Sequence, residues 1–146
     1  IAVLGEVNSK DKAHLEGMIS KGPYNSNITF FGFVNNIFEV LEASKILLLP
    51  IVAPHFCRPA IEAGYYKIPF IIRNHPGLSD FVINGYNCNT YDSLDEMKTL
   101  AIKLLDDVEY LQELGRNNFL VANKFNYTAS SGAQLLESIK NILNEK

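Results

Sequence analysis

Residues 45–72, KILLLPIVAPHFCRPAIEAGYYKIPFII, decide how this chain folds. The stretch contains a buried strand, a loop, a short helix that begins at a proline, and a second buried strand. In a parallel α/β sheet this order places the loop and the start of the helix at the carboxyl edge of the strands, where ligands bind. The first backbone N–H groups of a helix are unpaired and carry partial positive charge, so an anion such as a diphosphate is favoured there. The segment is therefore predicted to form a nucleotide-binding edge.

Strands and helices alternate along the rest of the chain. Runs rich in β-branched and aromatic residues predict strands, and apolar residues at helical spacing predict helices. The predicted strands lie at residues 1–4, 28–31, 45–51, 68–72 and 88–91, and the predicted helices at 10–20, 37–43 and in three segments after Asp92, the last capped by Thr128 or Ser130. Such alternation indicates βαβ units. The predicted fold class is α/β, a Rossmann-like parallel sheet flanked by helices, in one domain.

Composition limits the partners. The 146 residues are 47% hydrophobic and 20% charged, with a net charge of -3, which is typical of a globular domain and gives no reason to expect nucleic acid or an anionic membrane as a partner. No apolar run approaches the roughly 18 to 20 residues that a membrane span needs. We therefore expect a domain without a transmembrane segment, located in the cytoplasm.

The two cysteines, Cys57 and Cys88, are far apart in the sequence and have no companions that would suggest a metal site or a disulfide framework. They are expected to be free thiols. A nucleophilic role for Cys57 would require a paired base, and the sequence identifies none.

The order of several motifs resembles the C-terminal, donor-binding domain of GT-B glycosyltransferases of the GT4 type, also called group 1. The motifs are GE after the first strand, then ITFFGFV, KILLLPI, RPAIEAGYYKIPFI and LSDFVINGYNCNTY, followed by two or three helices. The resemblance covers essentially the whole chain. Its most specific part is residues 56–69, supported by Asp80 and by Asn84-Gly85. It implies the C-terminal half of a GT-B fold.

Glu62 matches the second Glu of the family's E-x7-E motif, which in those enzymes holds the ribose hydroxyls of the nucleotide. A carboxylate suits this role because it accepts two hydrogen bonds from a vicinal diol. The alternative is a solvated helix residue that pairs with Lys67 or another surface cation. The register with Pro69 favours the ligand-binding role.

The residues before Glu62 match the loop whose backbone amides face the donor sugar and phosphates in the family. They are Phe56, Cys57, Arg58 and Pro59. Pro59 suits the first helical position because it needs no N–H partner there. Arg58 is a candidate for a guanidinium contact to the diphosphate, with an ordinary surface arginine as the alternative.

The chain also departs from the family pattern. The first Glu of E-x7-E falls at Pro54, and two family glycines fall at His55 and Cys57. The carboxylate that usually contacts the donor sugar is therefore absent, so nucleotide recognition is better supported than sugar recognition. The family's Arg and Lys pair that clamps the diphosphate would lie before Ile1.

Three further residues are candidates for the site. Gly32 resembles the family's G-x-V turn beside the base, although an ordinary glycine at a strand end explains it equally well. His75 lies in the loop after the fourth strand, at the same edge as Glu62, and His55 lies in the loop before the helix. Both histidines are candidates for lining the cleft.

The resemblance implies a hexosyltransferase that moves a sugar from a nucleotide diphosphate sugar to an acceptor with retention of stereochemistry. No metal or other cofactor is expected, and the route is polysaccharide or glycoconjugate biosynthesis. Residues 1–146 are expected to be the nucleotide-sugar-binding domain without its own first strand and helix and without the preceding acceptor domain. That missing part would also supply any peripheral attachment to a membrane, and the chain alone would be inactive.

Rival classes differ in their motifs. A dinucleotide-binding Rossmann domain would show G-x-G-x-x-G after its first strand, but Gly5 is followed by EVNSK. A phospho-acceptor receiver domain would need acidic residues at the ends of the first and third strands, but the third ends in LPI. The alternative that stays open is a non-catalytic nucleotide-binding or protein-interaction relative of the same fold.

Overall fold

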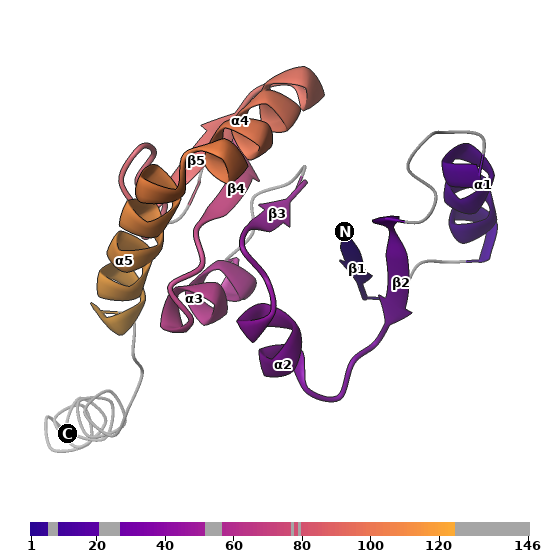
Figure 1. The fold of residues 1–146 in the computed structure, drawn as a ribbon, viewed down its shortest axis with the longest axis horizontal. Helices are drawn as coiled ribbons and strands as arrows, with labels where there is room; N and C mark the ends of the chain where they lie inside the picture. The colour runs from indigo at the N-terminus through magenta and orange to yellow at the C-terminus, as the bar shows by residue number, and fades with distance from the viewer. Residues whose placement is uncertain (6–8, 21–26, 52–56, 77, 79, 125–146) are drawn as a thin grey trace, which may run out of the picture. The chain divides into compact units, whose positions relative to one another are not determined.

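The computed structural model describes residues 1–5, 9–20, 27–51, 57–76, 78 and 80–124 (Figure 1). In chain order, its elements are β1 (Ala2–Leu4), α1 (Ser9–Ser20), β2 (Thr29–Gly32), α2 (Ile37–Glu42), β3 (Leu47–Leu49), α3 (Arg58–Tyr65), β4 (Phe70–Arg73), β5 (Cys88–Tyr91), α4 (Leu94–Asp106) and α5 (Val108–Lys124). The α/β alternation predicted from the sequence is confirmed.

The chain divides into two compact units, Ile1–Val40 and Leu41–Lys146. In the first unit, β1 and β2 pair in parallel, and Ala2 lies opposite Thr29. Both strands end at glycines, Gly5 and Gly32, which have φ angles of 93° and 64°. These angles lie in the left-handed region, where glycine costs least, so both glycines suit the turns that end these strands.

The second unit contains a parallel sheet with the strand order β3-β4-β5. The central strand is β4, in which Phe70 and Ile71 are fully buried and Ile72 is almost so. A parallel sheet is covered by helices on both faces, so its central strand is a continuous apolar run. This explains why the segment IPFII has no polar alternation.

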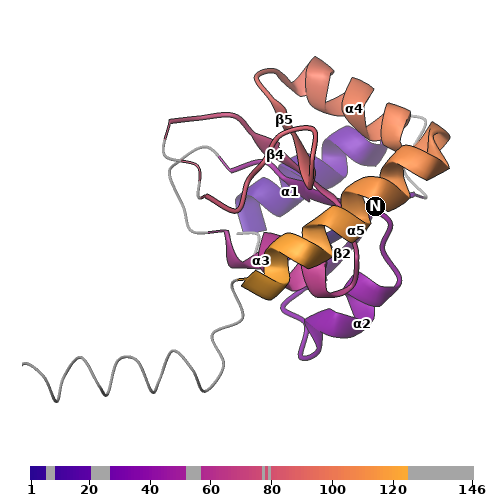
Figure 2. The same ribbon diagram turned by 90° about the vertical axis from the view of Figure 1, so that its left-hand side faces the viewer.

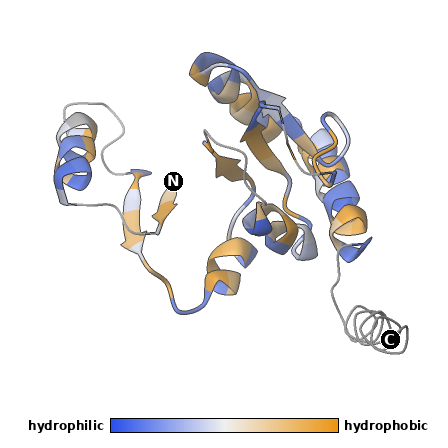
Figure 3. Cartoon of the chain, turned by 180° about the vertical axis from the view of Figure 1, so that it is seen from behind, coloured by the Kyte–Doolittle hydropathy of each residue, from blue (hydrophilic) through white to orange (hydrophobic). Residues whose placement is uncertain are grey.

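The sheet of the second unit has an apolar cluster on each face. Because neighbouring residues of a strand point to opposite faces, Ile71 belongs to a different cluster from Phe70 and Ile72. The Phe70 cluster contains Leu49, Cys57, Ala60, Ile61, Phe70, Ile72, Phe81, Cys88, Val121 and Ala122, and the Ile71 cluster contains Ile71, Tyr91, Leu104 and Leu114. Figure 3 shows β3 and β4 as hydrophobic, whereas α4 and α5 carry residues of both kinds.

Helix α5 runs alongside α3 (Figure 1 and Figure 2). The two helices approach closely because α3 carries Gly64 where they meet. A Cβ atom on Gly64 would lie 2.5 Å from the Cβ atom of Ala122 and 2.8 Å from the carbonyl oxygen of Asn118. No side chain fits at that position, so α3 has a fixed distance from α5.

The predicted elements differ from the observed ones mainly at their ends. The predicted strand at residues 45–51 is only Leu47–Leu49, and the one at 68–72 is Phe70–Arg73. The predicted strand at 88–91 is observed with those bounds. Thr128, Ser130 and the last predicted helix lie outside the described residues. Within the part of the chain that the structure describes, no helix has the length and apolar character needed to span a membrane.

Candidate functional site

The carboxyl ends of the three strands in the second unit share one edge of the sheet. The pairing places Leu49 of β3 opposite Ile72 of β4, and Arg73 of β4 opposite Tyr91 of β5. Because the strands are parallel, the segments that follow them begin at this same edge. These segments are the connection into α3, the loop after β4 and the start of α4. Ligands of open α/β sheets bind at such an edge.

The start of α3 has no side-chain cap. Cys57 occupies the N-cap position, but its side chain accepts no hydrogen bond from the helix. Instead, Cys57 is 1% exposed and packs in the Phe70 cluster. Helix α4, by contrast, has Ser93 at its N-cap, and the Ser93 hydroxyl accepts a hydrogen bond of 3.2 Å from the Glu96 N–H. Side-chain capping therefore satisfies the start of α4 but not the start of α3.

The first turn of α3 also lacks a negative charge. Of the helices that the structure describes, α1, α2, α4 and α5 all have an acidic residue in the first turn, whereas α3 has none and begins with Arg58. Acidic residues stabilise this end of a helix through its dipole, and a cation there is unfavourable. Arg58 therefore does not stabilise α3 through the helix dipole.

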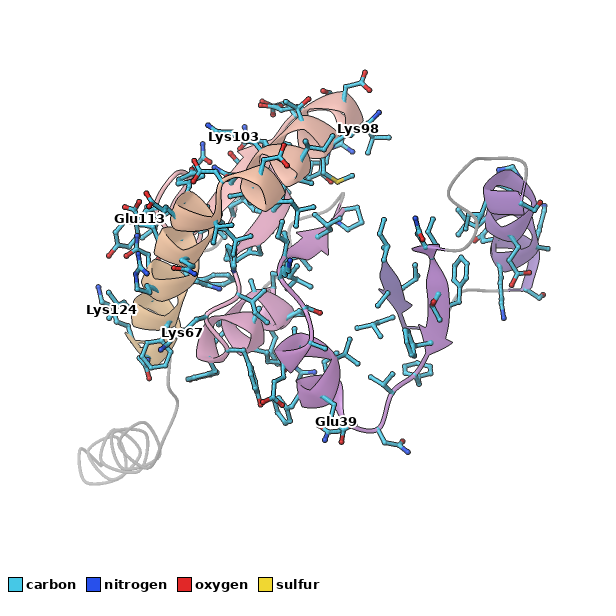
Figure 4. The ribbon with its side chains drawn as sticks, viewed as in Figure 1. Glu39, Lys67, Lys98, Lys103, Glu113 and Lys124 are labelled. Carbon is cyan, nitrogen blue, oxygen red and sulfur yellow. The ribbon has the colours of Figure 1, made fainter. Side chains whose placement is uncertain are left out.

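Arg58 and Glu62 form an ion pair on one face of α3. The Arg58 Nε atom lies 3.0 Å from the Glu62 Oε1 atom, and the side chains are 80% and 25% exposed, respectively. The two residues are four positions apart, which brings them to the same side of a helix. The cation next to Glu62 is thus Arg58, not the Lys67 that the sequence suggested as one alternative. Lys67 instead lies 5.6 Å from the ring centre of Phe119 on α5 (Figure 4).

The Cys57 thiol is shielded from solvent at this site. Burial raises its pKa, and the Glu62 carboxylate raises it further, although the nearby backbone N–H of Ala60 opposes the shift. A raised pKa keeps the sulfur protonated near neutral pH, and a protonated thiol is a poor nucleophile. This environment agrees with the expectation that Cys57 has no nucleophilic role.

The loop after β4 brings His75 to the same edge of the sheet. The His75 Nδ1 atom lies 2.9 Å from the Pro76 carbonyl oxygen, and the neighbouring Asn74 donates a 3.1 Å hydrogen bond to Asp92 at the end of β5. The topology thus places His75 and the start of α3 at one edge, and no hydrogen bond or ion pair joins His75 to Glu62 in the described part of the chain.

The structure gives no position relative to Glu62 for four predicted features of the site. Pro54, His55 and Phe56 lie outside the described residues, and Gly32 belongs to the first unit. Within the described ranges, no group of three or more His, Cys, Asp or Glu residues is arranged to hold a metal ion.

The Asn84-Gly85 turn supports the fold. The Asn84 Oδ1 atom accepts a 2.9 Å hydrogen bond from the Thr90 N–H, and Gly85 has a φ angle of 73°. Both features stabilise the turn that leads into β5. Asp80, which belongs to the same motif, is exposed.

Two buried asparagines lie near this turn. Asn87 belongs to the LSDFVINGYNCNTY motif, whereas Asn118 belongs to none of the family motifs. Asn87 and Asn118 are fully or almost fully buried, and the Asn87 Nδ2 atom donates a 3.1 Å hydrogen bond to the Asn118 Oδ1 atom. One signal in the sequence does mark Asn118. It falls at the helical spacing of Leu114, Val121 and Ala122, which are core residues of α5. A polar residue at an apolar position of a helix indicates a buried hydrogen-bond partner.

Comparisons with known proteins agree with this architecture. The chain superimposes on the Anabaena protein HepE in complex with UDP with a TM-score of 0.85, at 17% identity and over 96% of this chain and 40% of that one. The match to sucrose-phosphate synthase from Thermosynechococcus elongatus has a TM-score of 0.84, at 16% identity and over 99% of this chain and 39% of that one. The C-terminal domain of LpcC, a group 1 glycosyl transferase from Francisella tularensis, matches with a TM-score of 0.75, at 20% identity and over 88% of this chain and 69% of that one.

These structural matches confirm the Rossmann-like α/β fold of GT-B glycosyltransferases. The chain spans about 40% of the length of HepE and of the synthase. A comparison with curated proteins finds no match. A family model described as glycosyl transferases group 1 matches residues 1–120. Because that match covers most of the 146 residues, the chain belongs to the group 1 glycosyl transferases.

Proposed function

We propose that this chain is the donor-binding domain of a retaining hexosyltransferase that uses a nucleotide diphosphate sugar. Membership of the group 1 family supports the transferase class. The matched HepE structures are complexes with UDP and with UDP-glucose, which supports a nucleotide sugar as the ligand. We place the protein in the cytoplasm, in polysaccharide or glycoconjugate biosynthesis, with the acceptor held by another domain.

The uncapped and acid-free start of α3 is the observation that carries this proposal. Its amides lie at the carboxyl edge of a parallel sheet, and neither a side-chain cap nor a first-turn carboxylate compensates them. Pro59 has no N–H and the Ala60 N–H donates to the Cys57 carbonyl, so a diphosphate would accept a hydrogen bond from the Arg58 N–H and would be stabilised by the positive end of the helix dipole. The same helix start would stabilise the charge that develops on the leaving diphosphate during transfer, without any cofactor. The exposed Arg58 guanidinium would add a bidentate contact to the phosphates.

Glu62 would hold the ribose. Its side chain is 25% exposed, so it is partly desolvated yet accessible. In the ligand-free protein its carboxylate is occupied by Arg58, at 3.0 Å. The hydroxyl groups of a ribose would replace Arg58 as the hydrogen-bond donors to this carboxylate, and the Arg58 guanidinium would then be free to contact the phosphates. His55, Phe56, Cys57, Pro59 and His75 complete the proposed donor site of the second unit, and Gly32 of the first unit stays a separate prediction from the family's G-x-V turn.

The second candidate function is a non-catalytic relative that binds a nucleotide or a protein. Pro54 favours it, because it stands where the family has the carboxylate that contacts the donor sugar. Such a relative would bind the nucleotide through the start of α3 but would not recognise the sugar.

Calorimetric titration with UDP, GDP and ADP tests the proposal. We expect one of them to bind, and we expect amide chemical-shift changes at Arg58, Glu62 and Gly32 on its addition. The matching nucleotide sugar should bind at least as tightly as the diphosphate if the sugar is recognised, and more weakly if it is not. Absence of binding by all three diphosphates would contradict the donor-binding function, and equal shifts throughout the chain would contradict the location of the site.

A further inference from the structure

We propose that Asn118 of α5 is a positioning residue that sets the place of the first turn of α3 and thereby the affinity for the nucleotide. The inference rests on the proposed donor-binding function. It concerns a residue of another helix, in the second half of the chain, that would have no contact with the ligand.

The Asn118 side chain joins both ends of α3 to α5. Its Nδ2 atom donates a 3.2 Å hydrogen bond to the carbonyl oxygen of Ala60, in the first turn of α3. The same atom donates a 2.8 Å hydrogen bond to the carbonyl oxygen of Ile68, which follows α3. Because Asn118 is 1% exposed, no solvent competes for these bonds.

Both polar atoms of the Asn118 side chain have hydrogen-bond partners. An amide nitrogen has two hydrogens, and here one serves each carbonyl of the α3 segment. The Asn118 Oδ1 atom accepts a 3.1 Å hydrogen bond from Asn87 Nδ2, which agrees with the direction that the two carbonyls impose on the amide. Asn87 is held in turn, because it also donates to the Phe81 carbonyl at 2.8 Å and accepts from the Ile83 N–H at 2.9 Å. The Asn118 amide thus belongs to a connected buried network, and its two donors are directed by the Ala60 and Ile68 carbonyls.

The bond to Ala60 acts directly on the proposed phosphate site. The Ala60 N–H donates a 3.0 Å hydrogen bond to the carbonyl of Cys57, the N-cap residue. A shift of Ala60 would therefore move the amides of the whole first turn. Helix α4 fixes its own start with Ser93 and Glu96, whereas α3 has no side-chain cap. Because Pro59 has no N–H and the Ala60 N–H is bonded to Cys57, the tie to Asn118 would fix the first turn of α3 around the Arg58 N–H, which is the first-turn amide that an anion could use.

The close approach of the helices makes this tie sensitive to position. A Cβ atom on Gly64 would lie 2.8 Å from the carbonyl oxygen of Asn118, so the backbones are already in contact at this point. Without the tie at Ala60, α3 could pivot about the contact at Gly64. Its N-terminal turn would then move most, because it is the end of α3 that lies at the ligand edge.

The test compares Asn118→Leu with Asn87→Leu. Leucine is similar in size to asparagine but cannot donate, so Asn118→Leu removes both bonds to α3. Asn87→Leu removes the same Asn87–Asn118 bond but leaves the donors to Ala60 and Ile68. Both variants should unfold at lower urea concentration, because each leaves buried polar groups unpaired.

The two variants should differ in binding. For the diphosphate that binds the wild type, we expect about tenfold weaker affinity in folded Asn118→Leu, which corresponds to about 1.4 kcal/mol. We expect a change of less than about twofold in Asn87→Leu, or under about 0.4 kcal/mol. The amide resonances of Ala60 and Ile61 in the ligand-free protein should shift in Asn118→Leu and stay in place in Asn87→Leu.

Wild-type affinity in folded Asn118→Leu, or equal losses in both variants, would overturn the inference. Failure of the wild type itself to bind any nucleoside diphosphate would overturn the proposed function, and the inference with it. If Asn118→Leu does not fold, Asn118→Ser takes its place. Its single hydroxyl can donate to one carbonyl only, so its loss of affinity should lie between those of the wild type and a variant with no donor, and an unchanged affinity would again count against the inference.

Discussion

The backbone of Gly115 on α5 lies directly against the carbonyl oxygen of Lys67, two residues after the end of α3. A Cβ atom at position 115 would collide with that oxygen and would lie 3.0 Å from the Lys67 carbonyl carbon and 3.5 Å from the Pro69 Cδ atom. Backbone groups are much harder to displace than the ends of side chains. The contact therefore fixes where the segment between α3 and β4 lies against α5.

Gly115→Ala should destabilise the second unit. Overpacking against a rigid backbone costs about 1–3 kcal/mol, which exceeds the gain of about 0.5–1 kcal/mol from replacing a helical glycine by alanine. Urea unfolding monitored by circular dichroism would measure the change.

Gly17→Ala in α1 is the matched control, because a Cβ atom there would meet nothing within 4 Å. It should stabilise the protein by about 0.5–1 kcal/mol through helix propensity alone. If both substitutions stabilise the protein, the contact between Gly115 and Lys67 has no energetic importance.

The backbone of Lys67 makes a second prediction possible. Lys67 is the only residue other than glycine with a positive φ angle, 57°, in the described part of the chain. It ends α3 in a Schellman motif, since its N–H donates to the Gly64 carbonyl and the Ile68 N–H donates to the Ala63 carbonyl, at 2.9 and 3.0 Å. A left-handed conformation costs a residue with a side chain roughly 1–2 kcal/mol.

Lys67→Gly should therefore be more stable than Lys67→Ala, by about 1 kcal/mol. Both variants remove the interaction between Lys67 and Phe119 equally, so the comparison isolates the backbone. Thermal or urea unfolding of the two variants would measure the difference. Equal stabilities would mean that position 67 carries no conformational strain.

Much of the fold could be predicted from the sequence because its signals are local. The segment CNTY between turn residues predicts β5 with its observed bounds, and Pro59 places the start of α3 within one residue. Helical spacing likewise predicts α4 and α5. Strand ends are less predictable, because β3 and β4 end where their pairing ends and not where the apolar run does.

The site could be predicted only in part, for a different reason. Glu62, Arg58 and Cys57 are near one another in sequence, so a helix brings them together by itself. Asn118 acts on Ala60 from 58 positions away, and Asn87 acts on Asn118 from 31 positions away. Such contacts depend on how α5 packs on α3, which no local pattern specifies.

Burial of Cys88 predicts a loss of stability at high pH. Burial raises the pKa of this thiol from 9.0 to about 12, and the bond with the Ile83 backbone only partly opposes that shift. The folded state therefore keeps the proton while the unfolded state loses it above pH 9, so the contribution is fully present below pH 9 and is lost as the pH rises toward 12. The expected loss at pH 10 is about 1.4 kcal/mol relative to pH 8.

Cys88→Ala should lose less stability than the wild type between pH 8 and pH 10, by that amount, although it is less stable at pH 8 because of the cavity. Urea midpoints at the two pH values give both numbers. Parallel pH profiles for the two proteins would show that Cys88 does not titrate on unfolding.

The Arg58–Glu62 pair gives the last prediction, which separates the proposed roles of the two residues. Glu62→Gln should weaken binding of the nucleoside diphosphate by about one to two decades, because hydrogen bonds to a charged group contribute about 1.5–3 kcal/mol. Stability should change by only about 0.3–0.5 kcal/mol, since an i,i+4 ion pair at the surface is worth little more. Arg58→Ala should affect two ligands differently. It should weaken binding of the diphosphate, because the phosphates lose a neighbouring cation. It should leave binding of the corresponding nucleoside unchanged or slightly tighter, because Arg58 no longer occupies Glu62.

Calorimetry with both ligands measures this difference. The control is Lys12→Ala, which breaks the exposed Lys12–Glu16 pair of α1 at 3.8 Å and should alter neither affinity. Weaker binding of the nucleoside in Arg58→Ala would contradict the idea that Arg58 competes with the ribose for Glu62, and equal affinities of wild type and Glu62→Gln for the diphosphate would remove Glu62 from the site.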